Sequence, residues 1–92
     1  MQSPAHIRRW KRYPVNLPVS ILLCDGLKTK RVKGLGVEIS EGGISVYAGV
    51  PLKTGDLTEV AFSQFPNARL TAVVRSSTGY WFGLEFTSGL QS

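Results

Sequence analysis

The chain has 92 residues, of which 42% are hydrophobic and 18% charged, and this balance excludes a disordered chain and limits the protein to one domain. Its formal net charge is +5, but residues 1–37 carry eight Lys or Arg against one acid, whereas residues 38–92 carry three against five. Basic charge concentrated at one end of a chain points to an anionic partner, such as a phosphorylated small molecule, a nucleic acid or an acidic membrane surface.

The cysteine and histidine counts and the N-terminal residues indicate a cellular location. Cys24 is the one cysteine of the chain, which excludes an internal disulfide. Because His6 is the one histidine, the chain also has too few Cys and His ligands for a zinc site. Residues 1–6 contain no apolar segment of the kind found in secretory signals, and no stretch approaches the 18 or so apolar residues of a membrane span. We therefore expect a cytoplasmic protein without a membrane span, a metal or a cofactor.

Hydrophobic and polar residues alternate along most of the chain, which is the period of β-strands. Five apolar side chains occupy every second position of residues 15–23. In the next run, Leu35, Val37 and Ile39 alternate with glycine and polar residues. The predicted strands, in chain order, are residues 15–23, 30–40, 44–48, 57–63, 70–75 and 80–86.

Turn-forming residues separate the predicted strands. They lie at Asp25-Gly26, Glu41–Gly43, Pro51–Asp56, Phe65–Ala68 and Ser76–Gly79. Six short strands without a convincing helical pattern favour an all-β fold, a six-stranded antiparallel β-barrel with little or no C-terminal helix. We expect the barrel to comprise residues 13–87, preceded by a flexible basic arm at residues 1–12 and followed by a short tail at residues 88–92.

The basic arm contains the run Arg8-Arg9-Trp10-Lys11-Arg12, in which Arg8 and Arg12 have the spacing R-x-x-x-R. A guanidinium group can donate two parallel hydrogen bonds to a phosphate or to the O6/N7 edge of guanine. Two such groups on a flexible segment can close over a nucleotide. Solvated tails have the same composition, so the arm by itself leaves both interpretations open.

A second polar cluster, Glu38–Gly43, lies at the end of the second predicted strand and in the turn that follows it. If Val37 and Ile39 point inward, Glu38 and Ser40 share the outward face, where their carboxylate and hydroxyl lie about 7 Å apart. The two glycines of the cluster permit a turn with positive φ whose backbone amides can face a ligand. A plain hairpin turn has the same pattern, and this alternative also stays open.

The sixth predicted strand, Tyr80–Phe86, contributes an aromatic candidate. If Phe82, Leu84 and Phe86 form its inner face, Trp81 faces outward next to a glycine. An exposed indole beside a residue without a side chain offers a flat surface on which a base can stack. The alternative is that the N-terminal arm covers this tryptophan.

The two polar clusters together resemble the signature of PilZ domains, in which R-x-x-x-R precedes the first strand and [D/N]-x-S-x-x-G follows at a hairpin. Arg8 and Arg12 match the first part, with Arg9 giving the form R-R-x-x-R, and Glu38–Gly43 matches the second. The flanking sequences Tyr-Pro-Val, Val-Val-Arg and Phe-Gly-Leu-Glu-Phe also resemble the family. The resemblance covers about residues 8–87.

The resemblance implies a split barrel that binds cyclic di-GMP, a bacterial second messenger, on its outer surface. The arm arginines would bind phosphates and the guanine O6/N7 edge, and Glu38 would accept hydrogen bonds from guanine N–H groups. Ser40 would hydrogen-bond to the nucleotide, Gly43 would set the turn, and Trp81 would stack on a guanine. The residues to which the resemblance assigns ligand binding are Arg8, Arg9, Arg12, Glu38, Ser40, Gly43 and Trp81.

Position 38 departs from the family pattern, because the family has Asp or Asn there and this chain has Glu. The carboxylate is retained, but the extra methylene moves the acceptor and adds one rotatable bond, which is expected to weaken binding several-fold. Glu38 could instead pair with Arg8 or Arg12 and hold the arm closed without ligand.

These features favour a cyclic di-GMP receptor that signals by ordering its arm, which changes the surface offered to a downstream protein partner. One alternative is a degenerate PilZ-like adaptor that binds proteins and no nucleotide. Another is a small basic barrel that binds nucleic acid, although the chain lacks the ring of stacking aromatics that such modules use. An enzyme is not expected, because the sequence shows no nucleophile–base pair and no carboxylate dyad.

Overall fold

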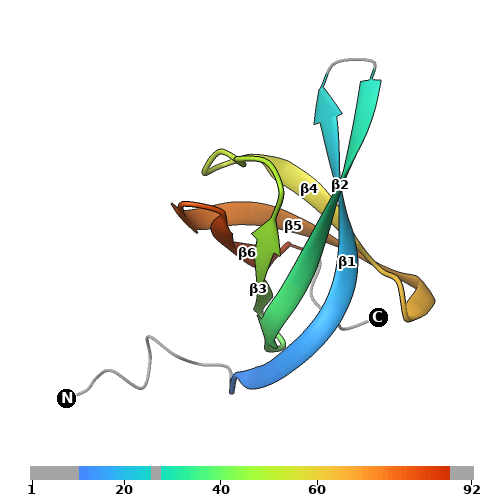
Figure 1. Ribbon diagram of the computed structural model, residues 1–92, viewed down its shortest axis with the longest axis vertical. Helices are drawn as coiled ribbons and strands as arrows, with labels where there is room; N and C mark the ends of the chain where they lie inside the picture. Colours follow the sequence, from blue (N-terminus) through green and yellow to red (C-terminus); the bar gives the residue numbers. More distant parts are fainter. Residues whose placement is uncertain (1–10, 26–27, 88–92) are drawn as a thin grey trace.

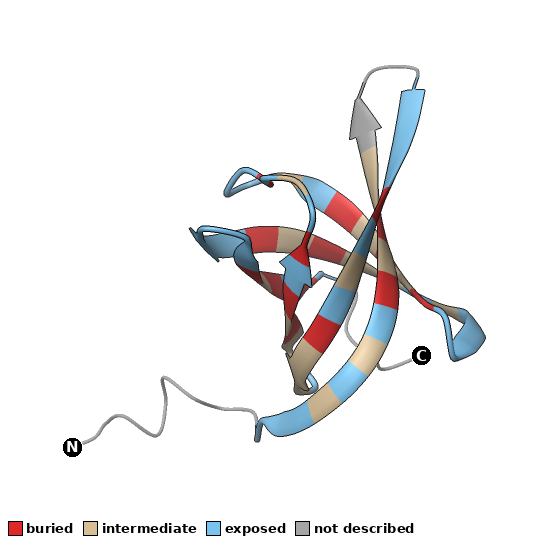
Figure 2. Ribbon diagram, in the orientation of Figure 1, coloured by how far each residue is buried: buried red, intermediate tan, exposed pale blue. Residues whose placement is uncertain are grey.

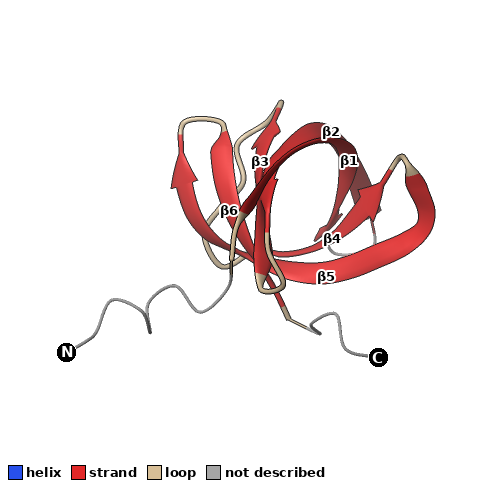
Figure 3. Cartoon of the chain, turned by 90° about the horizontal axis from the view of Figure 1, so that it is seen from below, coloured by secondary structure: helices blue, strands red, loops and turns tan. Residues whose placement is uncertain are grey.

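Six antiparallel strands form a closed barrel in the computed structural model of the protein, which describes residues 11–25 and 28–87 (Figures 1 and 3). The strands are β1 (Tyr13–Asp25), β2 (Lys28–Ile39), β3 (Gly43–Ala48), β4 (Leu57–Phe62), β5 (Phe65–Thr78) and β6 (Trp81–Phe86). Their order around the barrel is β1-β2-β3-β6-β5-β4, and pairing of β4 with β1 closes it. The predicted all-β, six-stranded barrel is confirmed.

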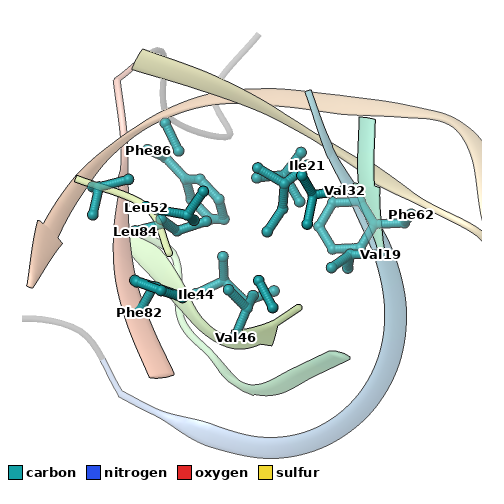
Figure 4. Packing of buried hydrophobic residues seen from close by; sticks show 14 residues of the cluster. Val19, Ile21, Val32, Ile44, Val46, Leu52, Phe62, Phe82, Leu84 and Phe86 are labelled. Atoms are coloured by element: carbon teal, nitrogen blue, oxygen red, sulfur yellow. The ribbon is translucent and has the colours of Figure 1, made fainter. Parts of the chain in front are cut away.

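The alternating sequence pattern explains the core (Figures 2 and 4). Every second residue of β3, β4 and β6 is buried. Phe82, Leu84 and Phe86 point into the barrel as predicted, while Trp81 lies on the outside. The hydroxyl of Thr58, a polar group inside this core, donates a hydrogen bond of 3.0 Å to the carbonyl oxygen of Ala72. The buried hydrophobic residues are Val19, Ile21, Val32, Ile44, Val46, Ala48, Leu52, Val60, Phe62, Ala72, Val74, Phe82, Leu84 and Phe86.

β5 is longer than its predicted extent at both ends. Residues 65–68, predicted to form a turn, belong to the strand, and the connection from β4 shortens to Ser63 and Gln64. An irregularity in the β4–β5 register beside Phe62 accommodates Pro66, which lacks the N–H group that a regular position in the ladder requires. At its other end the strand continues to Thr78 because β6 pairs with it that far.

β2 changes its inward face part of the way along, so the single alternation of Leu35, Val37 and Ile39 does not hold. Leu35 is on the outside, whereas Gly36 is buried. The β2–β3 register shifts between Gly36 and Glu38, which leaves Val37 as the extra residue of a β-bulge. Beyond the bulge, Ile39 packs against the core and the side chain of Glu38 is left on the outer surface.

The β1–β2 ribbon continues beyond the barrel wall and projects at the top of Figure 1. β2 pairs with β3 only from Gly34 onward, so residues 28–33 pair with β1 alone. Four cations lie along residues 28–33, and all four are exposed. They are Lys28, Lys30, Arg31 and Lys33.

Candidate functional site

A polar hollow of about 240 Å³ lies on the outer surface of the barrel, over the ends of β2, β3, β5 and β6. Arg12 lies at its rim, immediately before β1. Two arginines, two glutamates and three serines are among its lining residues, so it can meet negative charge and hydrogen-bonding groups together. The lining consists of Arg12, Glu38, Ile39, Ser40, Gly42, Gly43, Ile44, Ser45, Arg75, Ser76, Gly83, Leu84 and Glu85.

Two glycines give the hollow its shape, because each lets neighbouring atoms approach where a side chain would block them. Gly83 lies between Ser45 of β3 and Ser76 of β5. A Cβ at position 83 would be 2.5 Å from the Oγ atom of Ser76, and a Cβ at Gly43 would collide with the carbonyl oxygen of Leu84. Glycine at these two positions therefore leaves the floor of the hollow free of side chains and keeps the β3–β6 pair close together.

The turn between β2 and β3 is held by hydrogen bonds that involve Ser40. Its backbone N–H donates to the carbonyl oxygen of Gly43 at 2.9 Å, and its hydroxyl accepts from the N–H of Gly42 at 3.2 Å. The expected positive φ is wrong for Gly42 and Gly43, because in the described part of the chain only Gly55 and Gly79 have one. At Gly43 the need for glycine comes from the close approach of β6.

Two arginine–glutamate ion pairs lie at opposite sides of the hollow. At the β2 side, Nη1 of Arg12 is 3.4 Å from Oε1 of Glu38. At the β5–β6 side, Nε of Arg75 is 2.5 Å from Oε1 of Glu85. All four side chains are partly exposed, and ion pairs in such surroundings typically contribute only about 0–1 kcal/mol to stability. A ligand can therefore replace one partner of each ion pair with little loss of folding free energy.

Trp81 lies beside the hollow without lining it. It is 43% exposed, and its ring packs against that of Tyr47, with centroids 5.3 Å apart and the planes tilted by 55°. The two aromatic residues are direct partners across β3 and β6. Gly83, which lines the hollow, is two positions along β6 from Trp81, so the indole is placed next to the hollow on the same outer face.

The structure brings most of the sequence-predicted site residues together. Arg12, Glu38, Ser40 and Gly43 all line the hollow, and Trp81 flanks it. Arg8 and Arg9, which are also predicted to bind the ligand, lie outside the described residues. The sequence reasoning missed some lining and flanking residues, because their contribution depends on register and bulges. These are Ser45, Tyr47, Arg75, Ser76 and Glu85.

Within residues 11–25 and 28–87, no helix is long and apolar enough to cross a bilayer. The same residues contain no cluster of three or more His, Cys, Asp or Glu side chains that could hold a metal ion.

A small closed barrel with a charged hollow on its outer surface has the construction of a ligand-binding domain. The sequence matches the PilZ domain family over residues 6–92. The chain therefore belongs to the PilZ domain family, whose members are non-catalytic binding domains and are typically receptors for cyclic di-GMP.

Solved structures agree with this fold. The inhibitor of motility MotI/DgrA of Bacillus subtilis is similar with a TM-score of 0.64 and 23% identity, covering 95% of this chain and 44% of that one. This chain thus spans less than half the length of that protein. The PilZ domain of CeSA from a cellulose-synthesizing bacterium is similar with a TM-score of 0.64 and 20% identity, covering 84% of this chain and 80% of that one. Among curated proteins, none matches the sequence.

Proposed function

We propose that this domain binds cyclic di-GMP in the polar hollow. One observation supports this most directly: the two parts of the family's binding signature, 26 residues apart in the chain, meet at one place, where Arg12 contacts Glu38. Both residues line the hollow together with Ser40.

The chemistry of the lining fits a guanine nucleotide with phosphate groups. Arg12 can donate paired hydrogen bonds to a phosphate or to guanine O6 and N7. Glu38 can accept from guanine N1–H and N2–H. The Ser40 hydroxyl donates to the carbonyl oxygen of Gly43 at 3.5 Å and accepts from the N–H of Gly42, which leaves one acceptor lone pair for the ligand. Trp81 and Tyr47 offer aromatic surface beside the hollow for a base to stack on.

Binding requires the Arg12–Glu38 pair to rearrange, since each partner is needed by the ligand. The pair is half-exposed, at 48% and 35% of the two side chains, so water screens it and its loss is readily offset by charge-assisted bonds to a phosphate. The glutamate in place of the family's Asp or Asn still supplies a carboxylate. We expect it to lower affinity several-fold without abolishing binding.

The hollow is small and open, which supports a role for the arm. Pockets for small ligands typically enclose about 300–1,000 Å³, whereas this hollow offers about 240 Å³. A dinucleotide would thus need cover from a further segment, and the basic residues Arg8 and Arg9 are close in sequence to Arg12. Closure of the arm over the ligand changes the outer surface, and a downstream protein partner can recognise that change.

Calorimetric titration with cyclic di-GMP tests the proposal. The wild-type protein is expected to release or absorb heat with saturable, one-site or two-site behaviour, and Arg12→Ala is expected to weaken binding at least tenfold. Because Arg12 is exposed and its one described ion pair is screened, the melting temperature should change little. Absence of heat with wild-type protein would refute the proposal, and a large fall in melting temperature would show that Arg12 is structural.

One observation favours the adaptor alternative. Glu38 pairs with Arg12, so the same contact could close the site permanently. An adaptor of this kind would give no heat with cyclic di-GMP in the titration above. A nucleic-acid-binding barrel would instead bind oligonucleotides with an affinity that falls steeply with salt and would show no preference for the cyclic dinucleotide.

A further inference from the structure

Arg75 is the second arginine of the hollow, and it lies on the side opposite Arg12. The strands under the hollow follow the order β2-β3-β6-β5, so Arg12, paired with Glu38 of β2, and Arg75 of β5 face each other over β3 and β6. Neighbouring strands are about 4.8 Å apart, so β2 and β5 are separated by roughly 14 Å along the sheet. Two long arginine side chains that reach inward from these sides can contact one ligand of dinucleotide size.

A local irregularity of β5 places Arg75 there. Val74 pairs with Leu84 and Ser76 pairs with Gly83, so Arg75 between them has no partner in β6 and is the extra residue of a β-bulge. A bulge turns the side chain of the extra residue away from its regular direction. Arg75 and Ser76 are both exposed, as are the residues that follow them to the end of β5. The Arg75 guanidinium reaches Glu85, and both line the hollow.

The two sides of the hollow are built alike. At the β2 side, a bulge at Val37 precedes Glu38, which pairs with Arg12. At the β5 side, a bulge supplies Arg75, which pairs with Glu85. Each side thus holds one guanidinium against one carboxylate at the surface, which is an arrangement that a doubly anionic ligand can enter by replacing each carboxylate.

We propose that Arg75 is a second phosphate-binding residue of the hollow, and that Glu85 occupies its guanidinium until the ligand replaces the carboxylate. This inference rests on the proposed binding of cyclic di-GMP. Arg75 is 63% exposed and Glu85 is 55% exposed, so their pair is screened by water and can dissociate readily. A phosphate accepts paired hydrogen bonds from the guanidinium, and Glu85 then faces solvent.

The chain contains a matched control pair. Nη1 of Arg69 is 3.4 Å from Oε1 of Glu59, and these side chains are 54% and 41% exposed. They join β4 and β5 as Arg75 and Glu85 join β5 and β6. Neither Arg69 nor Glu59 lines the hollow. Substitution of Arg69 changes the net charge by the same amount as substitution of Arg75 but leaves the residues of the proposed site unchanged.

Calorimetric titrations with cyclic di-GMP, at several salt concentrations, compare wild type with Arg75→Gln and Arg69→Gln. We expect Arg75→Gln to weaken binding at least fivefold and to reduce the dependence of affinity on salt, because one phosphate contact is lost. Arg69→Gln should change affinity by less than twofold. Glu85→Gln frees Arg75 and should strengthen binding about two- to threefold, while Glu59→Gln should leave it unchanged. Melting temperatures of all four variants should stay close to that of wild type.

The outcomes separate this inference from the proposal on which it rests. If wild-type protein does not bind cyclic di-GMP, the proposed function is refuted and Arg75 has no such role. If wild type binds while Arg75→Gln and Arg69→Gln behave alike, the proposed function stands and the role of Arg75 is refuted. Weakening by Glu85→Gln would equally contradict it, since that result would make Glu85 a ligand-binding residue and not a competitor.

Discussion

Shortening Glu38 to aspartate is expected to strengthen binding of cyclic di-GMP. Nη1 of Arg12 lies 3.4 Å from the Glu38 carboxylate, which is already near the limit of hydrogen-bond distance. Loss of one methylene withdraws the carboxylate by about 1.5 Å, so the contact between Arg12 and this carboxylate is broken. Aspartate is also a residue that the family pattern has at this position, and it has one rotatable bond fewer to immobilise.

The magnitude follows from two contributions. Release of the partly exposed ion pair is worth about 0.2–1 kcal/mol, and the removed rotatable bond adds roughly 0.5 kcal/mol. Together they give about 0.7–1.5 kcal/mol, which corresponds to a roughly threefold to twelvefold lower Kd. Titration calorimetry measures this change directly, and thermal unfolding should show nearly the same stability for both proteins because the pair is screened.

Glu59→Asp is the matched control, since Glu59 pairs with Arg69 at the same 3.4 Å distance but outside the hollow. This control should leave the Kd unchanged. Weaker binding by the Glu38→Asp variant would refute the reasoning, because it would mean that the longer side chain is the one that reaches the ligand.

Two further substitutions probe the floor and the flank of the hollow. Gly43→Ala should destabilise the barrel by about 1–3 kcal/mol in denaturant unfolding, because a Cβ there meets the backbone of Leu84. Gly49→Ala is the control and should destabilise the barrel far less, because a Cβ at that position meets no atom within 4 Å. Equal losses of stability in the two variants would contradict the packing argument. Trp81→Ala should weaken cyclic di-GMP binding by about 1–3 kcal/mol if a guanine stacks on the indole. Tyr80→Ala, which removes another exposed aromatic side chain, should leave the affinity unchanged. Unchanged affinity for Trp81→Ala would exclude stacking at this position.

The sequence alone was sufficient for the strands and for much of the core. The period of two in β6 correctly placed Phe82 and Leu84 inside and Trp81 outside, because alternation is a direct consequence of strand geometry. The barrel class followed from six such strands with turn residues between them. Strand ends were less accurate, since β5 extends past its turn-forming residues wherever a neighbouring strand offers a partner.

The bulges could not be predicted from the sequence. Val37 and Arg75 each become the extra residue of a bulge because of how their strands pair with β3 and β6, and pairing between distant segments leaves no local signal. This is why the alternation of Leu35, Val37 and Ile39 does not continue across the bulge. For the same reason the site motif identified Arg12 and Glu38 but gave no indication that Arg75 would join them.

The projecting β1–β2 ribbon has a consequence for how copies of this protein meet. Along residues 28–33, no described strand pairs with the side of β2 that faces away from β1, so backbone groups there are open to another chain. A second copy aligned along that edge would bring lysines to within about 5 Å of lysines, and like charges at that spacing repel. Lys28, Lys30 and Lys33 thereby disfavour edge-to-edge aggregation along this exposed strand.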